Sequence, residues 1–438
     1  MAEVLDGAAP DADIALTSGV LTPGLVDIQT NGCFGVDFIT ATDEDWHRVS
    51  EQLPGTGVTA FQPTYITAPL DVLLGGLERA GAVFGALTGA QAMGIHLEGP
   101  FLSPHKPGVH DPRYLVAPTP ERVGAVLNTL TADGTRGLVT MVTLAPELDG
   151  GPAAVRHLAK AGVRVSLGHT DALAEQVLAA ADEGATLVTH IFNAQRPLNH
   201  REPGVPGAAL YDTRFTCGLI ADLHHVAPEI CTLVWRAAPG RVALVTDAIA
   251  AAGMPPGEYE LSGIQVFLGE DGVPRDAAGV IGGSALTLDR AVRNMIGIGL
   301  DEASVLDAAT RVPADAMGRR DLGRIEPGAR ADLVWFSDGY HPLRTWVAGR
   351  SVFEAGSGAE APADSQELAR NASPPSPDRR GNGVSDQAAT RRRRSTRLRT
   401  PRRAAGTAAN QEGRGLARRW RLRGRHRRGP GAGRHRRP

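Results

Sequence analysis

Short apolar segments alternate with segments of helical periodicity from Gly24 to Ile298 of this 438-residue chain. The helical spacing covers Asp43–Leu53, Leu70–Phe84, Glu121–Leu130, Gly151–Ala161, Ala172–Ala181 and Ala285–Ile298. Such an alternation predicts an α/β fold with a parallel sheet, and about 250 residues suffice to close that sheet into a TIM-like (β/α)8 barrel. A doubly wound open sheet is the alternative. It is disfavoured because no Gly-x-Gly-x-x-Gly turn follows the first buried strand, Gly24–Gln29.

Four strand-like segments end on side chains that can bind a metal ion or carry a proton. Glu98 follows an apolar run that begins at Gln91, and His169, His190 and Asp247 each end a further apolar run. Barrel enzymes keep their active sites at the carboxyl ends of the strands, so these side chains can converge there. Carboxylate and neutral imidazole suit Zn²⁺ or Fe²⁺, and three protein ligands leave a position for water. We therefore expect Glu98, His169 and His190 to hold one divalent metal ion.

Asp247 is expected to carry protons at this site. A metal ion lowers the pKa of bound water toward about 7, and an aspartate within reach can take the proton and deliver it to a leaving amine. The pattern thus indicates hydrolysis of an amide. Each residue also has a structural explanation: Asp247 as a helix N-cap, Glu98 as the partner of an arginine, and the histidines as hydrogen-bonded core residues. Their shared position at strand ends favours the catalytic explanation.

Charge is distributed very unevenly along the chain. The formal net charge is −2, yet nineteen arginines and one acid lie from Arg391 onward, which leaves about −20 on the first 390 residues. This tail raises a non-enzymatic alternative, the binding of nucleic acid or another polyanion with steep salt dependence. Trp420 is the single aromatic residue of the tail, and no nucleic-acid-binding fold is recognisable. Nucleic acid is therefore not the expected partner.

The chain is expected to be a cytoplasmic protein with no membrane segment. Cys33, Cys217 and Cys231 lack the spacing of a disulfide framework or a zinc ribbon, which favours a reducing compartment. Apolar runs are too short to cross a bilayer, and the N-terminus lacks the order of a signal peptide.

The sequence also indicates how the chain divides. We expect the metal-dependent barrel at 23–320 and turn-linked strands of a small β-domain at 321–355. Residues 356–438 are rich in Ser and Pro and then in Arg, and are expected to be disordered, because such low-complexity sequence cannot build a core.

Several motifs, taken in order, resemble those of one enzyme family. From about Pro23 to about Phe353 the chain is similar to the N-acetylglucosamine-6-phosphate deacetylases of the amidohydrolase superfamily. The motifs that carry the resemblance are Pro23–Gly32 (PGLVDIQTNG), His96–Phe101 (HLEGPF), Gly168–Thr170 (GHT), Thr189–Ala194 (THIFNA), Ile220–Asp222 (IAD), Val245–Ala248 (VTDA) and Gly282–Ser284 (GGS). Together they are a strong signal, whereas any one alone is weak.

The resemblance implies roles for particular residues. Glu98, His169 and His190 would hold the metal, with Zn²⁺ the first choice and Fe²⁺, Co²⁺ and Mn²⁺ as alternatives, and Asp247 would be the catalytic acid/base. The implied substrate pocket comprises Val109, His110, Asn193, Ala194, Arg201, His225, Ile281, Gly282 and Gly283. Arg201 and His225 would contact a sugar phosphate, for which a guanidinium group is well suited. Leu223 stands where the family usually has glycine.

The first strand departs from the wider superfamily. Gln29 and Asn31 occupy the places of two histidines that bind a second metal in other members, so the resemblance implies a single catalytic metal. Gln29 would either assist a weakly held second ion or make a structural hydrogen bond. The family usually begins with a longer β-rich segment, so residues 1–22 are expected to be the remnant of a shortened β-sandwich domain.

The implied reaction converts N-acetylglucosamine 6-phosphate into glucosamine 6-phosphate and acetate, in amino-sugar catabolism. N-acetylgalactosamine 6-phosphate, or the substrate of another amidohydrolase, stays open as an alternative. The substrate is thus expected to be a small phosphorylated amino sugar. Family members are commonly dimers or tetramers, so a homo-oligomer is expected by analogy.

Overall fold

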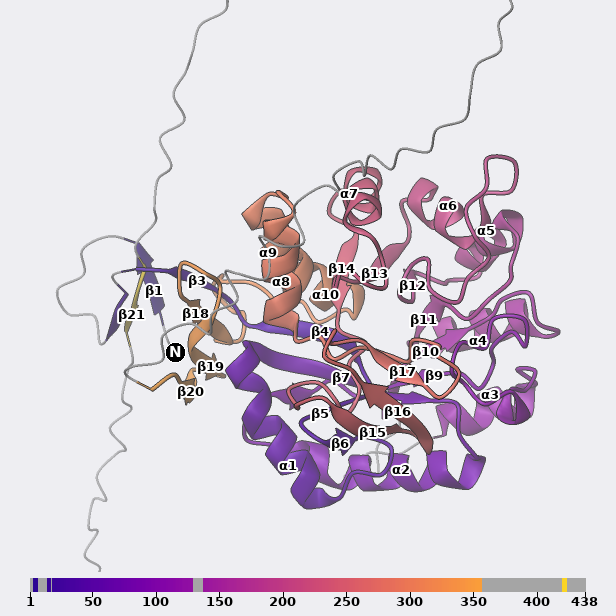
Figure 1. Ribbon diagram of the computed structural model, residues 1–438, viewed down its shortest axis with the longest axis horizontal. Helices are drawn as coiled ribbons and strands as arrows, with labels where there is room; N and C mark the ends of the chain where they lie inside the picture. The colour runs from indigo at the N-terminus through magenta and orange to yellow at the C-terminus, as the bar shows by residue number, and fades with distance from the viewer. Residues whose placement is uncertain (1–2, 7–13, 17, 129–136, 357–419, 424–438) are drawn as a thin grey trace, which may run out of the picture.

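A computed structural model describes residues 3–6, 14–16, 18–128, 137–356 and 420–423 (Figure 1). Its centre is a sheet of eight parallel strands, each paired with the next along the chain. The strands are β4 (Leu25–Thr30), β7 (Val58–Ile66), β9 (Ile95–Glu98), β10 (Val139–Leu144), β11 (Arg164–Leu167), β12 (Leu187–Val188), β13 (Thr216–Ile220) and β14 (Val242–Val245). A short strand, β8 (Gln91–Ala92), also pairs with β7.

The sheet closes into a barrel where its first and last strands meet. Just past β14, the Asp247 amide donates to the Gln29 carbonyl (2.9 Å), and the Asn31 amide donates to the Ala248 carbonyl (2.6 Å). We call this junction of residues 27–31 with 246–248 the seam. All nine positions of β7 are buried, as expected for a parallel strand covered on both faces. The predicted barrel is therefore confirmed.

Helices surround the strands (Figure 1). They are α1 (Asp43–Gln52), α2 (Leu70–Val83), α3 (Pro120–Leu127), α4 (Gly151–Lys160), α5 (Ala174–Asp182), α6 (Gly204–Tyr211), α7 (Pro228–Ala237), α8 (Leu288–Gly297), α9 (Glu302–Ala309) and α10 (Arg311–Ala316). Among the described residues, none of these helices has the length and apolarity needed to span a membrane.

Local sequence explains the start of α1 and the failure to predict α6. Thr42 caps α1 by accepting from the Asp45 amide, and the Asp45 side chain accepts from the Thr42 amide in return. In α6 most residues are buried Gly, Val, Pro and Ala, so the segment has no polar face. Helical periodicity cannot identify such a segment.

An antiparallel sheet covers part of the open end of the barrel. It consists of β15 (Gly257–Leu261), β16 (Ile264–Leu268) and β17 (Pro274–Asp276). Its inner face buries Leu261 and Val266 against Ile66 and Ile249. A tight turn of two-residue strands, β5 (Gly32–Cys33) and β6 (Val36–Asp37), lies beside it, where the Asp37 carboxylate accepts from the Ser262 amide.

A separate four-stranded sheet lies at one side of the barrel (Figure 1). It is ordered β20 (Arg350–Glu354), β19 (Pro342–Val347), β18 (Leu333–Phe336) and β3 (Val20–Pro23), with Leu333 opposite Pro23. Three of its strands fall within 321–355, and β3 runs across the boundary expected at residues 22 and 23. Strands from the two ends of the main body of the chain thus share one sheet.

A second small sheet joins the two ends of the chain. Its order is β1 (Glu3–Asp6), β21 (Trp420–Arg423), β2 (Ile14–Ala15), and Glu3 pairs with Arg423. The disorder predicted for 356–438 falls mostly outside the described residues, of which this stretch contributes residue 356 and the strand Trp420–Arg423. Strand pairing uses main-chain hydrogen bonds, which composition alone does not report.

Candidate active site

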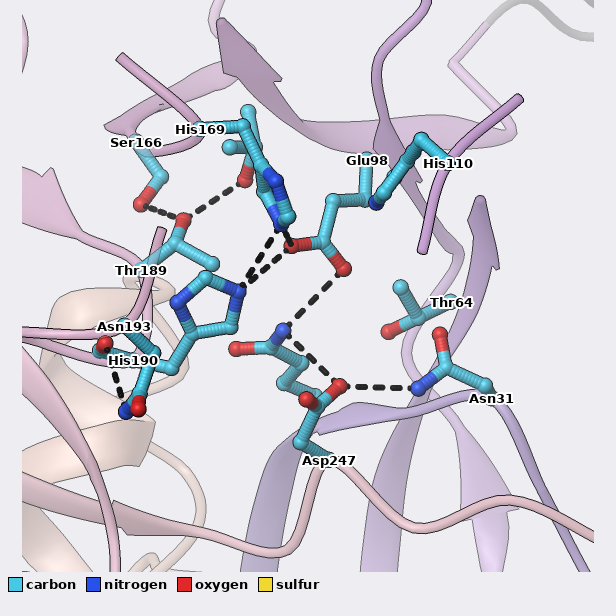
Figure 2. A network of polar contacts seen from close by, with 12 residues as sticks. Asn31, Thr64, Glu98, His110, Ser166, His169, Thr189, His190, Asn193 and Asp247 are labelled. Carbon is cyan, nitrogen blue, oxygen red and sulfur yellow. Dashed lines mark hydrogen bonds and ion pairs between the residues drawn. The ribbon is translucent and has the colours of Figure 1, made fainter. Parts of the chain in front are cut away.

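The barrel strands deliver the four predicted side chains to one point. Glu98 is the last residue of β9, and His169, His190 and Asp247 each follow the end of a strand by two positions. All four side chains are buried, and Figure 2 shows them pointing toward one another.

Three of these residues have an unusual backbone conformation. The φ angles of His169, His190 and Asp247 are 46°, 27° and 49°. A non-glycine residue in this left-handed region costs about 1–2 kcal/mol. Such strain persists only where the surroundings hold it, and it clusters at functional sites.

Glu98, His169 and His190 bring three potential metal ligands together. The Glu98 Oε1 atom lies 2.9 Å from His190 Nε2 and 3.1 Å from His169 Nε2, and the two Nε2 atoms are 3.2 Å apart. A tetrahedral ion with bonds of about 2.0–2.1 Å holds its ligand atoms about 3.3–3.4 Å apart. The three atoms would thus fit around a divalent cation if they moved slightly apart.

Hydrogen bonds orient His169 as a ligand. Its Nδ1 lies 3.0 Å from the Lys106 carbonyl, which can only accept, so Nδ1 carries a proton, and with a metal bound Nε2 would present its lone pair to the site. The His110 ring packs on His169 with centroids 4.3 Å apart. A ring nitrogen of His110 also comes within 4.8 Å of ligand atoms of Glu98 and His169, so His110 is a further candidate ligand. His190 Nδ1 is buried without a hydrogen-bond partner among the described residues.

The electrostatics of the site favour a cation between these groups. Burial opposes ionisation of Glu98, but His190 and His169 outweigh it and hold the pKa of Glu98 well below its usual range. Burial likewise opposes charge on His190, yet Glu98 raises its pKa to about 9. In the metal-free protein His190 is therefore protonated at neutral pH. A metal ion would take the place of this proton.

Asp247 lies on the side of Glu98 that faces away from the two histidines, and two side-chain amides hold its carboxylate. Its Oδ1 accepts from Asn31 Nδ2 (2.8 Å) and from Gln29 Nε2 (3.1 Å) (Figure 2). Gln29 Nε2 also lies 3.2 Å from Glu98 Oε2, so in this arrangement Gln29 is a donor between two carboxylates. Burial, and next the charge of Glu98, raise the pKa of Asp247 to about 6. A carboxylate with such a pKa can both accept and release a proton near neutral pH.

A cavity of about 590 Å³ opens onto these groups. Besides the metal and acid/base candidates, its lining includes most of the predicted substrate residues: Val109, His110, Asn193, Ala194, His225, Ile281 and Gly283. Two predicted residues, Arg201 and Gly282, do not line it. Arg201 is exposed, and a Cβ atom on Gly282 would lie 3.1 Å from Val109, so Gly282 permits close packing behind the cavity wall.

The cavity also contains residues that sequence reasoning missed. Lys106, His105, His224, Leu261 and Val280 all line it. Lys106 is one of two lysines in the chain, which is a signal that could have identified it. Leu261 and Val280 come from the β15–β17 region, and no strand-end pattern marks them.

The turn after β13 explains how the chain tolerates leucine in place of glycine at position 223. Leu223 has a φ of 65°, in the region that favours glycine. The Asp222 carboxylate stabilises this turn, because its Oδ1 accepts from the amides of His224 and His225, each at 2.9 Å. His225 Nδ1 lies 2.6 Å from Asp222 Oδ2. The turn therefore still presents both histidines to the cavity.

Comparison with known proteins places this site in context. The model of the amidohydrolase family matches residues 20–352. The chain is 38% identical over 334 residues to N-acetylgalactosamine-6-phosphate deacetylase from Escherichia coli O157:H7, which covers 76% of this chain and 87% of that protein. It is 37% identical over 348 residues to the mouse N-acetylglucosamine-6-phosphate deacetylase, covering 77% of this chain and 84% of that protein.

Solved structures agree with these relatives. The crystal structure of N-acetyl-D-glucosamine-6-phosphate deacetylase from Mycobacterium smegmatis superposes with a TM-score of 0.74 at 37% identity, covering 79% of this chain and 91% of that chain. The Pasteurella multocida N-acetylglucosamine-6-phosphate deacetylase gives a TM-score of 0.71 at 32% identity, with 76% and 86% covered.

Proposed function

Because the chain belongs to the amidohydrolase family, we propose that it hydrolyses the acetamido group of N-acetylglucosamine 6-phosphate, releasing acetate and glucosamine 6-phosphate in amino-sugar catabolism. The observation that carries this proposal is the convergence of Glu98, His169 and His190 beside Asp247 in one cavity. Relatives at 37% and 38% identity that are named for this class of reaction support it.

Glu98, His169 and His190 are the proposed ligands of one divalent metal ion. The donor set of one carboxylate and two imidazoles suits Zn²⁺ first, with Fe²⁺, Co²⁺ and Mn²⁺ as alternatives. When bound, such an ion polarises the amide carbonyl and makes water a better nucleophile at neutral pH. The Lys106 carbonyl keeps the His169 lone pair directed at this position.

Asp247 is the proposed acid/base. Its carboxylate accepts a proton from the water whose oxygen attacks the amide carbon. It returns that proton to the nitrogen as the carbon–nitrogen bond breaks, so the amine leaves neutral. Asn31 and Gln29 hold the carboxylate in place during both transfers. Burial favours the protonated form that the second transfer needs, and it raises the pKa of Asp247 to about 6 in the metal-free protein.

The remaining lining residues supply the proposed substrate contacts. His110 and Asn193 are placed to bind the sugar and its acetamido group, with Val109, Ala194 and Ile281 along the walls. His225, together with the lining residues Lys106 and His224, would bind the phosphate by charge and hydrogen bonds. Arg201 stays a predicted phosphate contact, although it is exposed outside this cavity.

N-acetylgalactosamine 6-phosphate is a second candidate substrate. The E. coli relative at 38% identity is named for that epimer, and the chemistry proposed for Asp247 and the metal ligands is the same for both sugars. A cytoplasmic location and assembly into a dimer or tetramer belong to the same proposal, by analogy with the family.

Acetate release from both sugar phosphates tests the proposal. Purified protein is assayed as prepared, after chelation, and after Zn²⁺ is restored. We expect release that is lost on chelation, recovered with metal and absent in Asp247→Asn. Asp149→Asn, which changes an exposed carboxylate, serves as the matched control. Release that survives both chelation and Asp247→Asn would contradict the proposed mechanism.

A further inference from the structure

Asp27 is a buried carboxylate to which the proposed mechanism assigns no role. It lies in β4 with a side chain that is 4% exposed. Its Oδ2 accepts from the Thr246 hydroxyl (2.6 Å), and its Oδ1 accepts from the amides of Gln29 (3.2 Å) and Thr246 (3.3 Å). None of these three donors is charged. A carboxylate buried without a cationic partner is costly, so its presence here calls for a function.

Two of these hydrogen bonds, those from Thr246, connect the two sides of the seam. Thr246 follows the last barrel strand, whereas Asp27 and Gln29 belong to the first. The Asp27 carboxylate accepts from the Thr246 main-chain amide, as a neighbouring strand's carbonyl would in a regular ladder. Main-chain bonds of Asp247 and Asn31 continue the link between the first and last strands, but at Thr246, immediately before Asp247, the link is made by the Asp27 side chain.

Both peptide groups that flank Asp247 are tied by this network. The Thr246 hydroxyl bonds Asp27 and accepts from the Ala248 amide (3.2 Å). The Thr246 carbonyl accepts from the Ser284 hydroxyl (2.6 Å), and the Asp247 carbonyl accepts from the Ser284 amide (2.8 Å). Asp247 itself has a φ of 49°, a left-handed conformation that costs a non-glycine residue free energy and that the surrounding hydrogen bonds stabilise.

We propose that Asp27 is a positioning residue that directs the Asp247 carboxylate into the cavity, acting through the Thr246 hydroxyl and the main chain on both sides of Asp247. This inference rests on the role proposed for Asp247. Its physical basis is that the left-handed backbone sets the direction of the Asp247 side chain. A displacement of about 1 Å in a reacting group can lower a rate about 100-fold.

The competing explanation is that Asp27 only stabilises the barrel. Two pairs of variants separate the explanations. Thr246→Val keeps the shape of the side chain but removes the hydroxyl, whereas Thr246→Ser keeps the hydroxyl. Asp27→Asn keeps an oxygen for the two amides, but its amide nitrogen can only donate to the Thr246 oxygen, so the Thr246 hydroxyl proton loses this acceptor. Asp332→Asn is its matched control, because Asp332 is also buried and accepts from a main-chain amide, that of Ala348 (2.7 Å), in the four-stranded sheet.

Steady-state kinetics and metal analysis of the purified full-length variants provide the test. We expect Asp27→Asn and Thr246→Val each to lower kcat about 100-fold while KM and bound metal stay at wild-type levels. Thr246→Ser should stay close to wild type. The double variant should be no worse than either single one, because both changes break the same link. Asp332→Asn should lose thermal stability without losing kcat.

Other results would overturn the inference. An unchanged kcat in Asp27→Asn would do so, as would a change confined to KM or to the amount of bound metal. So would a fall in kcat of equal size in Asp332→Asn, or a kcat in Thr246→Ser as low as that of Thr246→Val.

Amide hydrogen exchange keeps the inference separate from the proposed function. If the wild-type protein releases no acetate from either sugar phosphate, the proposed function fails. Exchange across residues 245–249 still reports the positioning. It should quicken in Asp27→Asn and Thr246→Val but not in Asp332→Asn, and unchanged exchange in the first two variants would refute the positioning role.

Discussion

Replacing Asp247 with asparagine should remove activity and at the same time stabilise the metal-free protein. The carboxylate is buried beside Glu98, and this surrounding raises its pKa from 3.8 to about 6. Asparagine keeps an oxygen that can accept from Asn31 Nδ2 and Gln29 Nε2, the two donors that bind Asp247 Oδ1. The substitution therefore removes a disfavoured charge while the hydrogen bonds remain.

The size of this effect follows from the ionisation equilibrium. Because one pKa unit corresponds to 1.36 kcal/mol, the difference between 3.8 and about 6 is worth about 3 kcal/mol of unfolding free energy. The sign is set by the raised pKa: the folded protein holds the Asp247 proton more tightly than the unfolded chain does. The favourable contribution is fully present below pH 3.8 and is lost as the pH rises through about 6. The Asp247→Asn variant has no carboxylate to ionise there, so its gain in unfolding free energy over the wild type grows with pH.

Urea unfolding of chelated wild type and Asp247→Asn at several pH values tests this reasoning. We expect no difference near pH 4 and a gain for the variant of about 3 kcal/mol at pH 8. Asp149→Asn, at an exposed position, should show no such dependence. A gain of equal size at pH 4 and pH 8, or no gain at pH 8, would refute the assignment of a buried, destabilising charge to Asp247.

Three further predictions concern the metal site and pH dependence. In the holoenzyme, kcat/KM should fall about ten-fold per pH unit below a midpoint at or below pH 6, because Asp247 must be ionised to accept a proton and bound metal lowers its pKa further. An acid limb whose midpoint lies well above pH 6 would contradict Asp247 as the base. Glu98→Gln should weaken metal binding by more than the ~10–100-fold typical of changes to groups behind the ligands, as measured by metal analysis after competition with a chelator; full occupancy would remove Glu98 from the ligand set. Gly108→Ala should lose metal as well as stability, because its Cβ would lie 3.0 Å from His169 Cε1 at a φ of 57°. Gly162→Ala, with a φ of 84° and open space around it, should lose stability alone, and equal metal contents in both would show that the His169 contact does not matter.

The barrel and the face that carries the candidate metal ligands could be predicted from the sequence, but the finer contacts of the site could not. The helices α1 and α2 were predictable because their apolar residues recur at helical spacing, whereas α6 is built almost entirely of apolar residues and has no such pattern. Lys106 and His224 lie on irregular segments, where no periodicity reports which way a side chain points. The distance of Arg201 from the cavity likewise depends on the path of the loop before α6.

The sequence by itself determined that strands and helices alternate and which residues end four of the strands. That information is local, since periodicity is read over a few neighbouring residues, and the geometry of parallel strands then places Glu98, His169 and Asp247 at one face. Only the tertiary structure decided the separations of 2.9–3.2 Å among the three ligand atoms, the left-handed backbone at Asp247 and the link from Asp27 to Thr246. The separations depend on how three other barrel strands pack, and the link from Asp27 depends on how the first and last strands meet across 219 positions of sequence. No local pattern encodes the position of such distant segments to within an ångström.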